Sequence, residues 1–198
     1  MTEQGWQVLV VDYGNESDLQ FNLAGVDLVI SLVSGAAQLA LIDAAFNVGV
    51  RRFAPAEFAG SSLLRPAGDA LDRGQSAALT RLYHYAARGM TYTVLSCGIL
   101  YERFGPGGTA AANIGQTSGN GSEGDYLMNV RELSAQVPLD SSGQPAIVCL
   151  TSAKDVGKFV VAALDLPDWP TELRMYGERR NVSDIIRVGE QMRSMLFF

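Results

Sequence analysis

The stretch VDLVISLVSGAAQLALIDAAFNVGVRRFAP, Val26–Pro55, decides the fold of this chain. It begins with the apolar run VDLVISLV, which is typical of a strand that helices bury on both faces. An alanine- and leucine-rich segment follows, and Gly49 stands where a helix ends with a left-handed residue. RRFAP then predicts a second strand. This order predicts two parallel strands joined by a right-handed crossover helix.

The alternation of strands and helices continues on both sides of this stretch. On the amino-terminal side, QVLVVDY (7–13) predicts a strand and ESDLQFNLAG (16–25) predicts a helix with a glycine stop. On the carboxy-terminal side, a helix over about 69–88 ends at Gly89, before the strand TYTVLSC (91–97). Repeated strand–helix units predict an α/β fold with a mostly parallel, doubly wound sheet and flanking helices.

The regular alternation stops after the strand TYTVLSC. A glycine-rich stretch comes next, followed by the strand-like runs DYLMNV (125–130) and AIVCLTS (146–152). Ser152 and Asp155 have the spacing of a capping box, which predicts the start of a helix. The remaining predicted elements are a strand at ELRMYG (172–177) and a helix over about 183–193.

Length and composition indicate one domain. A chain of 198 residues buries roughly 70% of the surface that its unfolded form exposes, which is enough for a core without disulfides. We expect a single domain over 1–198, with a βα core at 1–97, pocket-forming loops at 98–150 and carboxy-terminal helices and a strand at 151–198. Two cysteines, Cys97 and Cys149, lie in apolar strand-like runs and are expected to be core residues.

The charge pattern speaks against nucleic acid and membrane as partners. The net charge is −6 and the basic residues are scattered, whereas phosphate binding needs clustered Lys and Arg. The short run ERR (178–180) is expected to be a solvated turn. The amino terminus lacks the blocks of a signal peptide and no apolar run is long enough to span a bilayer, so we expect a soluble, cytoplasmic protein.

Six stretches of the chain, taken together, resemble one known family. They are VVDYGNESDL, GVDLVIS, LIDAA with GVRRFAPAEF, MTYTVLSCGILYERFGPGG, GDYLMNVR and LTSAKDVGKFVVAALDLPDWP. In this order they are similar to the NmrA-like branch of the atypical short-chain dehydrogenases, whose plant relatives include the isoflavone reductases. The stretches PAEF and YERFGPGG resemble the fungal members. The resemblance implies an NAD(P)-binding Rossmann-like fold with a small carboxy-terminal substrate region.

Two features of that family are not found in this sequence. Its members open with a strand, a G-x-x-G-x-x-G turn and a helix that bind the dinucleotide, whereas QVLVVDY here corresponds to their third strand. The resemblance therefore implies an amino-terminally shortened chain. The family's reductases also carry a lysine near the position of Leu79, but the first lysine here is Lys154. We expect a compressed sheet of five or six strands in which 7–13 pairs with 26–33, or an apolar edge covered in a homodimer.

The stretch GNGSEG, Gly119–Gly124, has the glycine spacing of a dinucleotide fingerprint. A true fingerprint follows a buried strand and opens a helix, whereas this stretch leads into the strand-like DYLMNV. We therefore interpret it as a mobile loop beside the substrate pocket.

The most site-like cluster is YERF, which follows the strand TYTVLSC. Tyr101 can donate a hydrogen bond to a carbonyl, and Arg103 can hold an anion or pair with Glu102. Glu57 follows a strand end where open α/β sheets bind ligands, although a role in holding its turn is equally open. Tyr101, Arg103 and Glu57 are the candidate catalytic residues. The candidate substrate-pocket residues are Ser34, Phe58, Leu79, Tyr83, Cys97, Ile99, Leu100, Phe104 and Tyr126.

Three functions remain open. The first is a redox-neutral, cofactor-independent enzyme that folds an apolar natural-product intermediate for cyclisation, pericyclic types included, or for isomerisation. The second is an NADPH-dependent or NADH-dependent reductase of secondary metabolism, and the third is a non-catalytic, NmrA-like binding or regulatory protein. The expected partner is a small apolar substrate. A metal site is not expected, because the single His84 and two separated cysteines are too few ligands.

Overall fold

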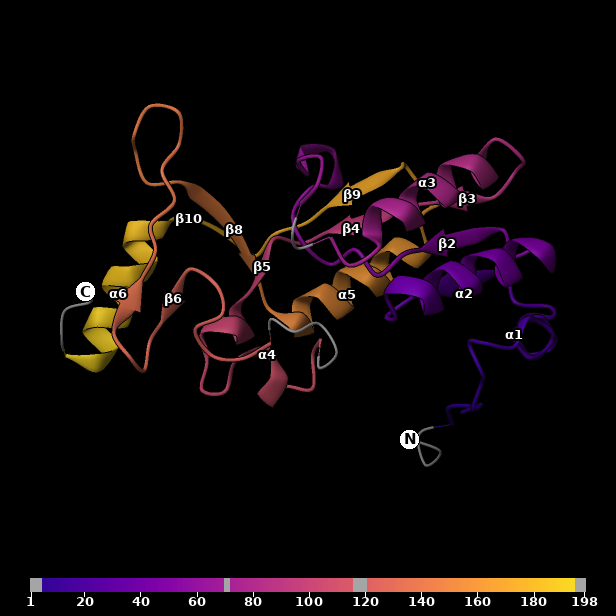
Figure 1. The fold of residues 1–198 in the computed structure, drawn as a ribbon, viewed down its shortest axis with the longest axis horizontal. Helices are drawn as coiled ribbons and strands as arrows, with labels where there is room; N and C mark the ends of the chain where they lie inside the picture. Colours follow the sequence, from indigo (N-terminus) through magenta and orange to yellow (C-terminus); the bar gives the residue numbers. More distant parts are fainter. Residues whose placement is uncertain (1–4, 70–71, 116–120, 195–198) are drawn as a thin grey trace. The chain divides into compact units, whose positions relative to one another are not determined.

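The computed structural model describes residues 5–69, 72–115 and 121–194. Figure 1 shows the order of its helices and strands along the chain. The chain separates into two compact units. Unit 1 comprises Met1–Glu57, Arg65–Leu95 and Asp168–Leu173, and unit 2 comprises Phe58–Leu64, Ser96–Pro167 and Arg174–Phe198. The single domain expected from the length stays a prediction.

Unit 1 contains the strand–helix–strand arrangement that the sequence predicts. Its sheet has the order β1–β2–β3 and both pairs are parallel. Helix α2 follows β1, leads into β2, and packs against α1 on one side and α3 on the other. The two parallel strands and the connecting helix predicted from 26–55 are therefore confirmed. The elements of this unit are α1 (Glu16–Leu23), β1 (Leu28–Ile30), α2 (Gly35–Asn47), β2 (Arg52–Ala54), α3 (Gln75–Ala86) and β3 (Thr91–Tyr92).

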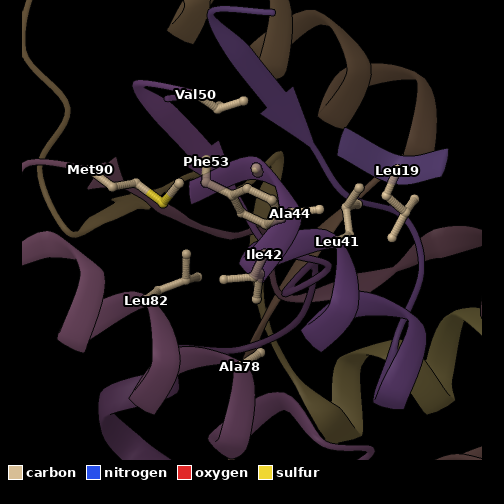
Figure 2. Close-up of a cluster of buried hydrophobic side chains, with 10 residues drawn as sticks. Leu19, Leu41, Ile42, Ala44, Val50, Phe53, Ala78, Leu82 and Met90 are labelled. Carbon is tan, nitrogen blue, oxygen red and sulfur yellow. The ribbon is translucent and has the colours of Figure 1, made fainter. Parts of the chain in front are cut away.

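The core of unit 1 lies where α2 and α3 meet the sheet. Figure 2 shows Phe53 of β2 among the side chains of Ile42 from α2 and Leu82 from α3. All three are fully buried, and Leu19 of α1 joins the same cluster. Burying side chains of this size is the main force that holds strand–helix layers together.

The strand predicted at 7–13 is wrong: residues 6–12 have no regular secondary structure. A strand is stable only when a neighbour satisfies its backbone N–H and C=O groups, and within the described ranges β1 pairs with β2 alone. Trp6, Val8, Leu9 and Val10 are correspondingly exposed, with Val10 at 95%, whereas Val11 and Tyr13 pack against the core of unit 1. The apolar run predicts a tendency to form a strand, whereas the partner strand decides whether one forms.

The single five- or six-stranded sheet is also wrong, because the largest sheets among the described residues have three strands. The segment 91–96 changes its hydrogen-bonding partner between β3, which pairs with β2, and β4 (Val94–Ser96). The N–H of Thr93 still donates to the Phe53 carbonyl at 3.2 Å, but the N–H of Val94 donates to the Thr171 carbonyl at 2.9 Å. From there β4 pairs with β9 (Glu172–Arg174).

Unit 2 is built around β8, which has β5 on one side in parallel and β10 on the other in antiparallel orientation. Strand β10 is the stretch expected to be a solvated turn, so that prediction is wrong. Its polar residues are typical of an edge strand, where apolar periodicity gives no signal. The elements of this unit are β5 (Ile99–Leu100), a 3-10 turn at Tyr101–Phe104, α4 (Gly108–Ala111), β6 (Met128–Asn129), β7 (Ser134–Ala135), β8 (Ile147–Thr151), α5 (Ala153–Leu164), β10 (Glu178–Asn181) and α6 (Val182–Arg193).

Helix boundaries follow local chemistry. The predicted start of α5 at Ser152 is confirmed, since the Asp155 N–H donates to Ser152 Oγ at 3.1 Å. The second bond differs from that of a capping box, because the Asp155 carboxylate accepts from the Ser152 hydroxyl, at 2.9 Å. Helix α3 begins six residues later than expected, at Gln75, because Gly74 in the left-handed region precedes it. None of the helices in the described ranges has the length and apolar character needed to cross a membrane.

Replacing Ser152 with Ala is expected to lower the free energy of unfolding by about 1 kcal/mol, because the substitution leaves the Asp155 N–H without its cap. Urea denaturation followed by circular dichroism measures the change. The matched control is Ser183→Ala in the first turn of α6, where the side chain of Asn181 caps the helix. Equal losses in both variants would show that the Ser152 hydroxyl does not stabilise α5.

Candidate binding pocket

Unit 2 contains a pocket of about 640 Å³. Its floor is apolar and is formed by residues from the 3-10 turn, β6, β8 and α6. They include Phe104, Met128, Leu150, Ile185, Val188 and Met192. A cavity of this size with an apolar lining and a few polar groups is typical of a site for a small organic ligand.

Helix α6 forms one wall because of its residue spacing. Ile185, Val188, Gly189 and Met192 occur at the i, i+3, i+4, i+7 positions that place side chains on one face of a helix. The opposite positions carry charges, such as Arg187, which pairs with Asp184 at 2.9 Å. The amphipathic pattern of α6 therefore presents an apolar stripe to the pocket.

One side of the pocket carries a hydrogen-bonded chain of three polar groups. The Tyr101 hydroxyl donates to Glu178 Oε2 at 2.9 Å, and Arg180 forms an ion pair with the other oxygen of Glu178. Hydrogen bonds from Arg180 and Tyr101 lower the pKa of Glu178, whereas burial and the hydrogen bond to Glu178 raise the pKa of Tyr101. At neutral pH the carboxylate is thus ionised and the phenol is protonated.

A second polar group of the pocket centres on Glu123. Its carboxylate accepts a hydrogen bond from the N–H of Gly107 at 3.0 Å and pairs with Arg131 at 3.1 Å. Glu123 belongs to the stretch GNGSEG, of which residues 119–120 lie outside the described ranges. The described part, 121–124, does not open a helix, and Glu123 lines the pocket.

Two of the predicted site residues, Tyr101 and Phe104, line this pocket. Their neighbours in YERF have other contacts. Glu102 accepts hydrogen bonds from the N–H of Ala153, at 3.0 and 3.1 Å, and so caps α5. Arg103 lies over the ring of Tyr126, with 5.4 Å between the guanidinium carbon and the ring centroid.

Glu57, a predicted catalytic residue, lies in unit 1 and is completely buried. Its two carboxylate oxygens accept hydrogen bonds from Arg65 at 3.1 and 2.5 Å, and the hydrogen bond to Glu57 raises the pKa of Arg65. The N–H of the preceding Ala56 donates to Gln38 Oε1 at 2.6 Å. Of the two interpretations of Glu57, these contacts support the one in which it holds its turn.

The other predicted pocket residues do not belong to the described lining of the unit 2 pocket. In unit 1, Ser34 precedes α2 as its N-cap, and Leu79 and Tyr83 lie on α3. In unit 2, burial raises the pKa of the Cys97 thiol to about 11, so the thiol is protonated at neutral pH. The remaining predicted pocket residues in unit 2 are the half-buried Phe58 and the two residues of β5, Ile99 and Leu100.

Sequence reasoning missed the contribution of β10 and α6. The sequence predicts a turn at 178–180 and a helix over about 183–193, but it does not predict that Glu178, Arg180 or the apolar residues of this helix line a pocket. The apolar stripe of α6 was a usable signal, because its spacing is visible in the sequence. Nothing in the sequence places that stripe opposite Tyr101, since they are brought together only by the pairing of β5, β8 and β10.

Unit 1 carries a shallower hollow beside α2 and α3. Asp43 forms an ion pair with Arg81 and accepts a hydrogen bond from the Tyr85 hydroxyl at 2.8 Å. His84 lies at the same hollow, and its ring centroid is 5.6 Å from that of Tyr85. The described ranges bring no three His, Cys, Asp or Glu side chains together in a group that could hold a metal ion.

The motif resemblance implies a dinucleotide, and the described residues do not by themselves form its phosphate cradle. Such a cradle needs a glycine turn and free amides at a helix N-terminus. Helix α2 opens with Gly35, but its N–H donates to the Arg73 carbonyl at 3.2 Å, and a side chain at Gly74 would come within 3.1 Å of the Gly35 Cα. The remaining helices of eight or more residues are capped from within the chain, by Asn15, Asp72, Ser152 with Glu102, and Asn181.

No protein-family profile and no curated protein matches this sequence. Solved structures do match. Leucoanthocyanidin reductase from Vitis vinifera, in a ternary complex, aligns with 99% of this chain and 64% of its own at 16% identity, with a TM-score of 0.66. Isoflavone reductase aligns with 93% of this chain and 57% of its own at 19% identity, with a TM-score of 0.64. Triphenylmethane reductase from Citrobacter sp. aligns with 99% and 63% at 15% identity, with a TM-score of 0.61.

The chain spans about three fifths of the length of these reductases, from 57% to 64%. At such low identities the likeness concerns the fold. Isoflavone reductase is among the plant relatives named by the motif resemblance, and the structural match to it supports the fold that the resemblance implies. The assignment to the NmrA-like branch and to its fungal members stays a prediction. This chain has the Rossmann-like α/β fold of these reductases.

Proposed function

We propose that this chain is the substrate-binding part of an NAD(P)H-dependent reductase that acts on an apolar, ring-containing molecule. The observation that carries the proposal is the pocket of unit 2, with its apolar floor and its hydrogen-bonding side chains, in a chain with a reductase fold. Among the proteins of similar fold, leucoanthocyanidin reductase is described in a complex with NADPH, and AtPrR2 is described with NADP+ and (+)pinoresinol. These ligands are known for those proteins and support the proposal by analogy of fold.

In this proposal the residues of the pocket bind and orient the substrate. The apolar side chains of α6, β6 and β8 remove a ring system from water, which contributes about 25 cal/mol for each Å² of apolar surface buried. The polar chain of Tyr101, Glu178 and Arg180 fixes the orientation of the ring by a hydrogen bond at one side of the pocket. No chemical step is assigned to a dinucleotide, because the described residues do not form its cradle.

A charge in the apolar floor tests the proposal. Val188→Asp is expected to weaken binding of the neutral fluorescent probe N-phenyl-1-naphthylamine about tenfold, because the carboxylate must stay hydrated where the rings bind. Val188 is 55% exposed, so the substitution is compatible with folding. Val161→Asp on α5 is the matched control: Val161 is 63% exposed and belongs to the same unit but not to the described pocket lining. Absence of probe binding, or equal weakening in both variants, would contradict the proposal.

A second candidate is the redox-neutral enzyme that carries out cyclisation or isomerisation without a cofactor. It is supported by the caps at the helix N-termini and by the first lysine being Lys154. Isothermal titration with NADPH and NADH tests the second candidate. Binding at micromolar affinity excludes it and supports the reductase, whereas faster conversion of a diene or polyene precursor by this chain without added dinucleotide supports the second candidate.

A further inference from the structure

We propose that Glu178 makes the pocket of unit 2 selective for ligands that donate a hydrogen bond, such as ring alcohols, over ligands that can only accept one. This inference rests on the proposed function of the pocket as a site for an apolar ring molecule. It assigns a specificity-determining role to a residue on β10 that no motif of the sequence singles out.

The first step concerns the hydrogen of Tyr101. A phenol has one O–H to donate, and in this structure it donates to Glu178 Oε2 at 2.9 Å. The oxygen of Tyr101 therefore faces a ligand as an acceptor. The sequence-based expectation that Tyr101 donates to a substrate carbonyl requires this hydrogen bond to break first.

The second step concerns the carboxylate of Glu178. An ionised carboxylate only accepts hydrogen bonds, and its two oxygens have about four lone-pair positions. Arg180 contacts Oε1 of Glu178 and Tyr101 donates to Oε2, so the carboxylate has lone pairs left that can accept a hydrogen bond from a ligand hydroxyl. Glu178 is still 38% exposed and lines the pocket, so a ligand can reach it. A hydroxyl that donates to an ionised acceptor forms one of the stronger hydrogen bonds in proteins.

The third step accounts for the donors of the pocket. Arg180 is paired with Glu178, and Arg131 is paired with Glu123 at 3.1 Å. Arg193 is a further lining residue, at the last position of α6. A ligand that offers only an acceptor to the Tyr101 hydroxyl must displace the hydrogen bond from Tyr101 to Glu178, whereas a ligand that offers a donor to Glu178 adds a hydrogen bond. A site that bonds a donor group of its ligand can discriminate strongly against ligands without that group.

Two naphthalene probes test the inference, one with a hydroxyl group and one with a methoxy group at the same ring position. The wild-type chain is expected to bind 2-naphthol about fivefold more tightly than 2-methoxynaphthalene, whose oxygen only accepts. In Glu178→Gln the preference is expected to fall to about one, because the amide nitrogen offers a donor to the ether and the charge is lost. Glu132→Gln, an exposed residue of unit 2 that is not among the described lining residues, is the matched control and keeps the wild-type preference.

A second variant tests whether any change at this side of the pocket would alter the preference between the probes. Tyr101→Phe keeps the carboxylate of Glu178 and frees one of its acceptor positions, so the preference for 2-naphthol is expected to persist. Equal affinities for the two probes in the wild type, or an unchanged preference in a Glu178→Gln variant with the wild-type melting temperature, would overturn the inference alone. If neither probe binds, the proposed function fails together with the inference.

Discussion

Replacing Glu57 with Ala is expected to lower the free energy of unfolding by about 3–5 kcal/mol, because it removes both hydrogen bonds of a buried ion pair and leaves Arg65 with the more distant carboxylate of Asp69, at 3.9 Å. The side chain of Glu57 is 0% exposed and that of Arg65 is 11% exposed. Two hydrogen bonds join them, at 3.1 and 2.5 Å. Urea denaturation of the variant and of the wild type measures the loss.

The control for this prediction is an ion pair of the same unit at the surface. Asp27 and Arg51 pair at 2.8 Å, but both side chains are 75% exposed. Asp27→Ala is therefore expected to change the free energy of unfolding by at most about 1 kcal/mol. If Glu57→Ala costs no more than Asp27→Ala, the pair with Arg65 does not hold the PAEF turn, and a functional role for Glu57 becomes the better interpretation.

Replacing Phe53 with Ala is expected to lower the free energy of unfolding by about 3–5 kcal/mol. Phe53 is completely buried in β2, among Ile42 and Leu82, as Figure 2 shows. Removing the ring loses its transfer energy and leaves a cavity, because neighbouring helices and strands relax only in part. The same urea denaturation, followed by circular dichroism, gives the value.

Phe21 provides a control of the same residue type. It lies on α1 and is 82% exposed. Phe21→Ala is expected to change the free energy of unfolding by less than about 0.5 kcal/mol, since little surface is returned to water. Similar losses in the two phenylalanine variants would contradict the packing of Phe53 against α2 and α3.

Local structure could be predicted from the sequence where neighbouring residues determine it. Ser152 and Asp155 cap α5 as their spacing predicts, and Gly49 follows the end of α2 with a φ of +85°. The unit from β1 to β2 is confirmed for the same reason: apolar periodicity and helix ends are encoded within a few residues. The mostly parallel α/β fold follows from repeating that unit.

The candidate site could be predicted only in part. Tyr101 and Phe104 were found because they follow a strand in a motif with a known resemblance. Glu178, which is 77 residues from Tyr101, was not found, because its hydrogen bond depends on the pairing of β8 with β10. Glu57 was found as a polar residue after a strand, but only the position of Arg65 supports its role in the turn.

The sequence by itself determined the α/β class, the positions of most helices, the caps that end or begin them, and the absence of clustered basic residues. These properties depend on residue type and on short-range spacing. Only the tertiary structure decided that 7–13 forms no strand, that the ladder changes partner at Val94, and that α6, β10 and Tyr101 surround one pocket. Each of these depends on hydrogen bonds and packing between segments far apart in the chain, which spacing along the sequence does not encode.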